Sequence, residues 1–153
     1  MGLDMYLSKK TFIGAQYEHR NVVVNIDITI DGKPAKINPK KVSYIEEAAM
    51  YWRKSNGIHQ WFVDNCQGGQ DDCQPYDVSL DKLKELLEVC KQVQADHSKA
   101  EELLPTQSGF FFGSTEYDEW YFQDIDETIT GLEELIAEHS PEDDPYYVYQ
   151  ASW

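Results

Sequence analysis

Alternation of apolar and polar residues dominates the first third of the chain and predicts β-strands. Residues 4–13 place four apolar side chains among polar neighbours, and residues 22–30 alternate with a period of two at their end. Asp31 and Gly32 form a typical turn pair, after which residues 35–37 are expected to return as a hairpin partner. These segments predict a small antiparallel sheet.

The middle of the chain changes to the period of an α-helix. A short strand is expected at residues 42–45. Residues 46–65 then place apolar side chains along one helical face, which predicts a helix that Gly57 weakens locally. Residues 65–75 hold two adjacent glycines and two adjacent aspartates without any hydrophobic period, and they predict a loop.

Two further helices are indicated by their ends as well as by their apolar stripes. Ser79 is a good N-cap for a helix that runs to about residue 95, and residues 98–104 are expected to add one turn and a half. Thr115, followed three residues later by Asp118, approximates the capping box of a long helix that ends at His139.

These elements together predict an α+β fold in which a small antiparallel sheet packs against three main helices. Residues 109–113, where two glycines bracket three phenylalanines, predict an additional short strand that is buried on both faces or threads the core. One domain is expected to span residues 1–140. An acidic and then aromatic tail follows at residues 141–153, and it either stays disordered or adds a strand.

The charge of the chain narrows the classes of partner. With 28 acidic against 13 basic residues, the formal net charge is −15. Such a field repels the phosphates of nucleic acids, so direct binding to DNA or RNA is disfavoured. An acidic surface can instead imitate nucleic acid toward a basic protein, although excess negative charge more often serves solubility.

The remaining composition indicates a cytoplasmic protein. No apolar run approaches the ~20 residues of a membrane span, and the amino terminus lacks a basic region followed by a hydrophobic one. Neither export nor membrane insertion is therefore expected. The three cysteines, Cys66, Cys73 and Cys90, form no Cys-x-x-Cys pair, which favours reduced thiols over disulfides or a zinc site.

One segment rich in chemically capable side chains is residues 51–62. If it is helical, Trp52, Asn56 and His59 share one side. Arg53 would then hold a carboxylate or phosphate, and His59 would serve as acid, base or ligand. The alternative, favoured by helix geometry alone, is an amphipathic helix whose aromatic residues and histidine belong to the core.

A second such segment is residues 109–121, where a strand gives way to the start of a helix. Backbone N–H groups at a helix start bind anions. Glu116, Asp118 and Glu119 already supply negative charge there and compete with a phosphate, so a capped helix entering the core is the favoured alternative.

A metal site finds little support in the sequence, and no metal or other cofactor is predicted. Imidazole and carboxylate groups suit several divalent ions, so a site would combine His59 or His97 with acidic residues, namely Asp71, Asp72, Glu116 or Asp118. Their spacing matches no known metal motif, and phosphate-binding-loop and nucleophile-elbow motifs are also absent from the sequence.

Three strings resemble a family of small, functionally uncharacterised bacteriophage and prophage proteins. They are Met-Gly-Leu-Asp-Met-Tyr-Leu at residues 1–7, the Tyr-Trp-Arg-Lys…Ile-His…Trp-Phe-Val segment at residues 51–63, and the Leu-Leu-Pro-Thr…Gly-Phe-Phe-Phe-Gly-Ser-Thr-Glu-Tyr-Asp-Glu-Trp-Tyr-Phe segment at residues 103–122. The resemblance covers most of residues 1–139 and brings no catalytic residues. It implies a phage accessory protein that acts in the host cell on host machinery or immunity.

The leading hypothesis from the sequence is an anti-defence protein that sequesters a small polar ligand, such as a nucleotide-derived immune signal. Trp52 or Trp61 would stack a base, Arg53 and Lys54 would hold phosphate, and the polar edges would be bound by Asn56, His59 and Thr115, with Ser114 and Glu116 beside them.

Two alternatives stay open. One is a hydrolase or lyase that uses His59 with Glu116 or Asp118. The other is an acidic inhibitor that docks on a basic host protein through Glu133 and Glu134 or through residues 142–144. The sequence is compatible with a homo-oligomer. It does not show whether residues 51–62 and 109–121 meet in space.

Overall fold

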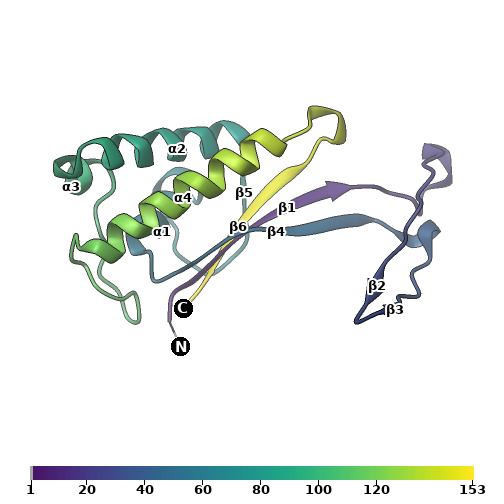
Figure 1. The fold of residues 1–153 in the computed structure, drawn as a ribbon, viewed down its shortest axis with the longest axis horizontal. Helices are drawn as coiled ribbons and strands as arrows, with labels where there is room; N and C mark the ends of the chain where they lie inside the picture. The colour runs from purple at the N-terminus through teal and green to yellow at the C-terminus, as the bar shows by residue number, and fades with distance from the viewer. Residues whose placement is uncertain (1) are drawn as a thin grey trace.

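A computed structural model describes residues 2–153 as an antiparallel four-stranded sheet covered on one face by helices (Figure 1). The strands lie in the order β4-β1-β6-β5. Their bounds are β1 Asp4–Phe12, β4 Tyr44–Arg53, β5 Tyr76–Val78 and β6 Tyr146–Ser152, with a separate hairpin of β2 Thr29–Ile30 and β3 Lys33–Pro34. The helices are α1 Asn56–Cys66, α2 Leu80–Ala95, α3 Ala100–Leu103 and α4 Glu119–Glu138. The predicted α+β class is confirmed.

Strand β1 lies between β4 and β6 and is hydrogen-bonded to both. Its alternating sequence pattern gives the strand one buried face. Leu3, Met5 and Leu7 are at most 1% exposed and point into the core, whereas Tyr6 faces outward. Met5 pairs with Trp52 of β4 on one side and with Ala151 of β6 on the other. The start of β1 therefore fixes the end of β4, from which the chain enters α1.

Of the two outcomes expected for residues 141–153, the structure shows the added strand. Strand β6 lies between β1 and β5, and its alternate residues Tyr147, Tyr149 and Ala151 are buried. Burying two tyrosines and completing the sheet stabilises this segment by hydrophobic transfer as well as by backbone hydrogen bonds.

The helix predicted over residues 46–65 is wrong in its first half. Residues 44–53 form strand β4, and the helix begins only at Asn56. Residues 46–50 are mostly good helix formers, but pairing with the whole length of β1 outweighs their local preference.

The strand predicted over residues 22–30 is also largely wrong. Thr29 and Ile30 pair with Lys33 and Pro34, and the N–H of Ala35 donates to the carbonyl of Ile28 (2.8 Å), so the predicted return segment 35–37 takes part through Ala35. The predicted turn is confirmed, because Asp31 and Gly32 have φ values of 51° and 74°, as a type I′ hairpin turn requires. The segment projects from the domain, where no second sheet face covers it (Figure 1).

The helices that follow agree with their sequence signals. Ser79 caps α2 by accepting a hydrogen bond from the backbone N–H of Lys82. Helix α4 ends near His139 as predicted, but its cap is Asp118, which accepts from the N–H of Tyr121, and not Thr115. Among residues 2–153, no helix has the length and apolar composition needed to cross a bilayer.

The buried strand predicted at residues 109–113 is wrong, because this segment forms a turn. Phe110 is 81% exposed and Phe111 has a left-handed φ of 68°, so only Phe112 of the three enters the core. The turn thereby brings residues 106–118 over the start of α1, where the candidate site lies.

Candidate functional site

A pocket lies where the end of β4, the start of α1, the loop before α4 and the first turns of α4 converge. It encloses about 290 Å³, close to the lower limit for small-molecule sites. Residues 51–62 and 109–121, which the sequence singles out, therefore do meet in space. The lining comprises Arg53, Lys54, Ser55, Asn56, Gly57, Thr106, Gly113, Ser114, Glu116, Asp118, Trp120, Tyr121 and Asp124.

Asn56 holds the two segments together. Its side-chain amide donates hydrogen bonds to the carbonyl oxygens of Phe112 (3.1 Å) and Ser114 (2.9 Å), and its oxygen accepts from the N–H of Gln107 (2.9 Å). Both amide hydrogens are thus used within the protein. Asn56 lines the pocket, and its 3% exposed side chain fixes the loop that forms the opposite wall.

Lys54 occupies an unusual backbone conformation at the mouth of the pocket. Its φ is +58°, and its N–H donates to the carbonyl of Leu3 (2.7 Å). Gly113, itself at φ +88°, packs so closely that an added Cβ would lie 3.1 Å from Cβ of Lys54. A left-handed non-glycine residue costs free energy and recurs at functional sites, where surrounding contacts maintain it.

The positive wall of the pocket consists of Lys54, Arg53 and the start of α1. Arg53 is already paired with Asp4 (Nη1 to Oδ1, 3.3 Å), whereas Lys54 has no carboxylate of residues 2–153 within ion-pair distance. Ser55 occupies the N-cap position of α1 without making a side-chain cap bond. The N–H of Asn56 donates to the carbonyl of Lys54 (3.0 Å), and the helix start adds partial positive charge to this wall of the pocket.

The opposite wall carries carboxylates, among them Asp124. Partial burial raises its pKa to about 6, the neighbouring Ser55 side chain works against this shift, and the charges of Glu127 and Asp118 add to it. Asp118 accepts the capping bond of α4, and the Glu116 N–H donates to Oγ of Ser114 (3.0 Å). The pocket thus has carboxylates facing a lysine and a helix start.

Two aromatic residues of α4 complete the pocket. Trp120 is 66% exposed at its rim, and the Tyr121 hydroxyl donates to the carbonyl of Leu104 (2.7 Å). Neither Trp52 nor Trp61 lines the pocket, since these side chains are 5% and 8% exposed and belong to the core. The prediction that one of them stacks a ligand is therefore corrected, and Trp120 is the tryptophan placed to do so.

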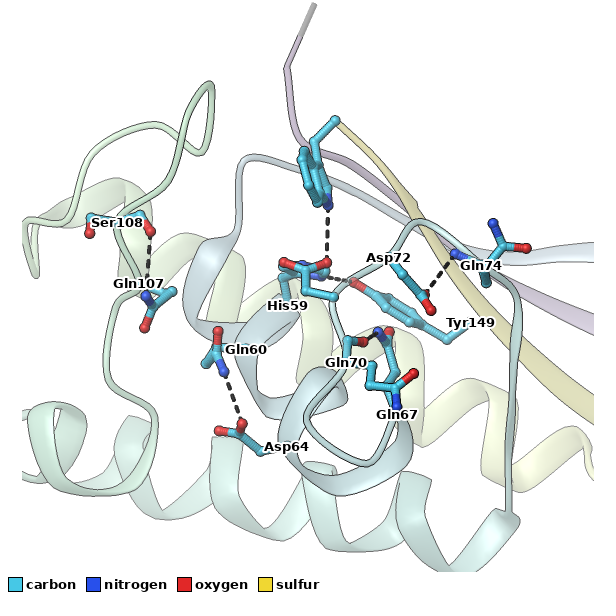
Figure 2. Close-up of polar contacts among 12 residues, drawn as sticks. His59, Gln60, Asp64, Gln67, Gln70, Asp72, Gln74, Gln107, Ser108 and Tyr149 are labelled. Atoms are coloured by element: carbon cyan, nitrogen blue, oxygen red, sulfur yellow. Dashed lines mark hydrogen bonds and ion pairs between the residues drawn. The ribbon is translucent and has the colours of Figure 1, made fainter.

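His59 lies elsewhere, behind α1. Its side chain has no exposed surface, and Nδ1 contacts the hydroxyl of Tyr149 (2.6 Å; Figure 2). Nε2 lies 3.0 Å from Oδ2 of Asp71, whose other oxygen accepts from the Trp153 indole. The predicted role of His59 at the ligand, and its pairing with Glu116 or Asp118, are corrected, because it joins α1 to β6 and the loop before β5.

The other predicted site residues divide clearly. Arg53, Lys54, Ser114 and Glu116, which the sequence predicts to bind ligand, line the pocket. Thr115 is exposed outside the lining, and its carbonyl accepts from the hydroxyl of Thr106 (2.9 Å). Among residues 2–153 no three histidine, cysteine or acidic side chains converge in an arrangement able to hold a metal ion.

Ser55, Trp120, Tyr121 and Asp124 also line the pocket, although they were not predicted from the sequence as site residues. One signal was present for Asp124: it lies four residues before Thr128 on α4, beside the apolar stripe rather than on the solvent face. Comparison with protein-family models, curated protein sequences and solved structures gave no match. Function must therefore be inferred from the pocket itself.

Proposed function

We propose that the protein binds and sequesters a small polar ligand that carries one anionic group, hydrogen-bond donors and a flat ring. The observation that carries this proposal is the opposition of Lys54 and the α1 start to three carboxylates, with Trp120 at the rim. The cationic wall would hold the anionic end of such a ligand. The carboxylates on the other wall would accept hydrogen bonds from amino or hydroxyl groups at its opposite end.

A nucleoside monophosphate has this chemistry. Its phosphate fits Lys54 and the N–H groups at the start of α1, and carboxylates such as Glu116 accept from base amino groups. Trp120 supplies a face on which a base stacks. The carboxylates and the volume, equal to about ten water molecules, disfavour ligands with several phosphates. In a cell with nucleotide-based defences, capture of such a ligand would remove an immune signal.

The second candidate function is a hydrolase or lyase that acts on the same ligand. The observation that favours it is the raised pKa of Asp124. A carboxyl group with a pKa of about 6 can exchange protons near neutral pH, as a general acid or base must. In this reading Asp124, rather than His59, moves the proton. The two candidates differ in whether the ligand leaves chemically unchanged.

Mass spectrometry of small molecules released by denaturing the protein tests both candidates. The purified protein is incubated with a cell extract and washed, in parallel with Lys54→Met and with Lys84→Met, which removes an exposed lysine of α2 far from the pocket. An intact nucleotide enriched on the wild type and on Lys84→Met, but not on Lys54→Met, supports sequestration.

Recovery of cleavage products alone, with loss of products in Asp124→Asn, favours the enzyme. Equal recovery from the wild type and from Lys54→Met overturns the pocket as the binding site.

A further inference from the structure

Residues 16–41 form an arm that contributes nothing to the core of the protein. Strands β1 and β4 run together out of the domain, and beyond them the chain continues to the hairpin β2–β3, far from the helices (Figure 1). No residue between 15 and 51 is buried. Ordering such a segment costs conformational entropy that the arm does not recover by burial in its own chain.

The arm also exposes aliphatic side chains that a monomer has no reason to present together. Val23 is 85% exposed and Ile30, in the hairpin, is 62% exposed. Val22, Ile28 and Ile37 are exposed as well. Clusters of exposed apolar residues on a projecting element mark interaction surfaces.

The charge of the arm is opposite to that of the remaining protein. The arm holds five basic and three acidic residues, a formal charge of +2, which leaves −17 for the rest of the chain. The surface that complements an apolar, basic arm is therefore found on this same protein. At the base of the arm, Arg20 and Val22 line a cavity together with the protein's own Glu142, Asp143 and Asp144. The β2–β3 hairpin lies farther out and points away from its own helices, so the surface that complements the hairpin is sought on a second copy (Figure 1).

A groove with the required chemistry lies between β4 and α4. Its lining combines Ala48, Ala49 and Leu135 with the carboxylates of Glu47, Glu134 and Glu138, and it also includes Lys9, which pairs with Glu47 (3.9 Å). It encloses about 170 Å³ beside the open edge of the sheet, since β4 is paired with β1 on one side only. The apolar side chains of this groove and the carboxylates of Glu134 and Glu138 match Ile30 and Lys33, which lie opposite each other in the hairpin.

We infer that the protein forms a homodimer by arm exchange, in which the β2–β3 hairpin of each copy lies in the β4–α4 groove of the other. A twofold axis makes the two contacts identical, so Ile30 packs on the apolar floor and Lys33 pairs with Glu134 or Glu138 at both ends. The inference is independent of the ligand that the pocket binds.

The test is sedimentation equilibrium of the full chain at low and at high ionic strength. The wild type is expected to be dimeric at about 100 µM at low salt, which an association with Kd of about 1 µM would ensure. Added salt is expected to weaken the dimer because the pairs are exposed. Variants Lys33→Glu and Glu134→Lys, each at an exposed position, are expected to raise the dissociation constant at least about tenfold.

The decisive sample is an equimolar mixture of Lys33→Glu with Glu134→Lys. Each arm then meets a groove of opposite charge, and dimers are expected to return as heterodimers. Lys84→Glu on α2 is the matched control and should leave the dissociation constant unchanged. A wild type that stays monomeric at low salt overturns the inference, as does a dimer that is indifferent to both variants or a mixture that fails to associate.

Discussion

The side-chain amide of Asn56 donates a 2.9 Å hydrogen bond to the carbonyl oxygen of Ser114, across 58 residues of sequence. This contact, at the first residue of α1, fixes the loop that carries the opposite wall of the pocket. The pocket consequently depends on a residue whose own polar groups are all used within the protein.

Replacing Asn56 with alanine is expected to destabilise the protein by about 2–3 kcal/mol, since it leaves two carbonyls and the N–H of Gln107 without their partner. Asn65→Ala is the matched control, because Asn65 donates to one carbonyl, that of Trp61, and should cost about 1 kcal/mol. Urea unfolding measures both. Equal costs would show that Asn56 does not organise the loop.

Gly113→Ala should weaken ligand binding as well as stability. A residue other than glycine at φ +88° is strained, and the new Cβ would press on Lys54. Gly68→Ala provides the control for backbone strain alone, since Gly68 has φ +61° with open space around it. The expectation is a loss of about 1–2 kcal/mol in both variants, but weaker ligand capture in Gly113→Ala alone.

The raised pKa of Asp124 predicts a specific pH dependence of the free energy of unfolding. Its pKa rises from 3.8 unfolded to about 6 folded, so the folded state binds the proton more tightly and the free energy of unfolding falls as pH rises from about 4 to 6. Above pH 6 the ionised group destabilises the fold by about 1 kcal/mol after allowance for solvent screening.

Asp124→Asn should therefore raise stability at pH 7 and flatten the profile between pH 4 and 6. Asp126→Asn, an exposed position on the same helix, serves as the control in urea unfolding at each pH. A wild-type profile that rises through this window, with no change in Asp124→Asn, would contradict the assignment.

The hydroxyl of Tyr149 is expected to stabilise the fold without affecting the ligand. Tyr149→Phe keeps the ring stacked on Phe62 but leaves the fully buried His59 without its Nδ1 partner, at a cost of about 2 kcal/mol. Tyr147→Phe removes a comparable contact with the part-buried His139, where water replaces it, and should cost less. Thermal unfolding compares the two, and unchanged ligand capture in Tyr149→Phe separates the His59 network from the pocket.

The sequence predicted elements best where local signals and tertiary contacts agree. Ser79 with the stripe of α2, the alternation of β1 and the Asp31-Gly32 turn carry their structures in short windows. Strand β4 could not be predicted from a short window, because Glu46, Glu47 and Ala48 locally favour a helix. Pairing with β1 along the strand outweighs that local preference.

That error also explains which site residues were found. Placing Trp52 on a helix aligned it with His59, although the strand directs its indole into the core, where it donates to the hydroxyl of Thr128. Lys54 and Glu116 were found because their charges stand out locally. Asp124 and Trp120 were missed because their approach to Ser55 and Lys54 depends on how α4 packs, which no window of sequence contains.

The four tryptophan indoles make the central claim directly measurable by ¹H–¹⁵N NMR during titration with adenosine monophosphate. The proposal predicts shifts of the Trp120 indole and of the amides at residues 53–57 and 113–118, with the buried indoles of Trp52 and Trp61 unmoved. Shifts confined to the Trp153 indole and the loop around Asp71, or no shifts at all, would contradict the assignment of this pocket to a nucleotide-like ligand.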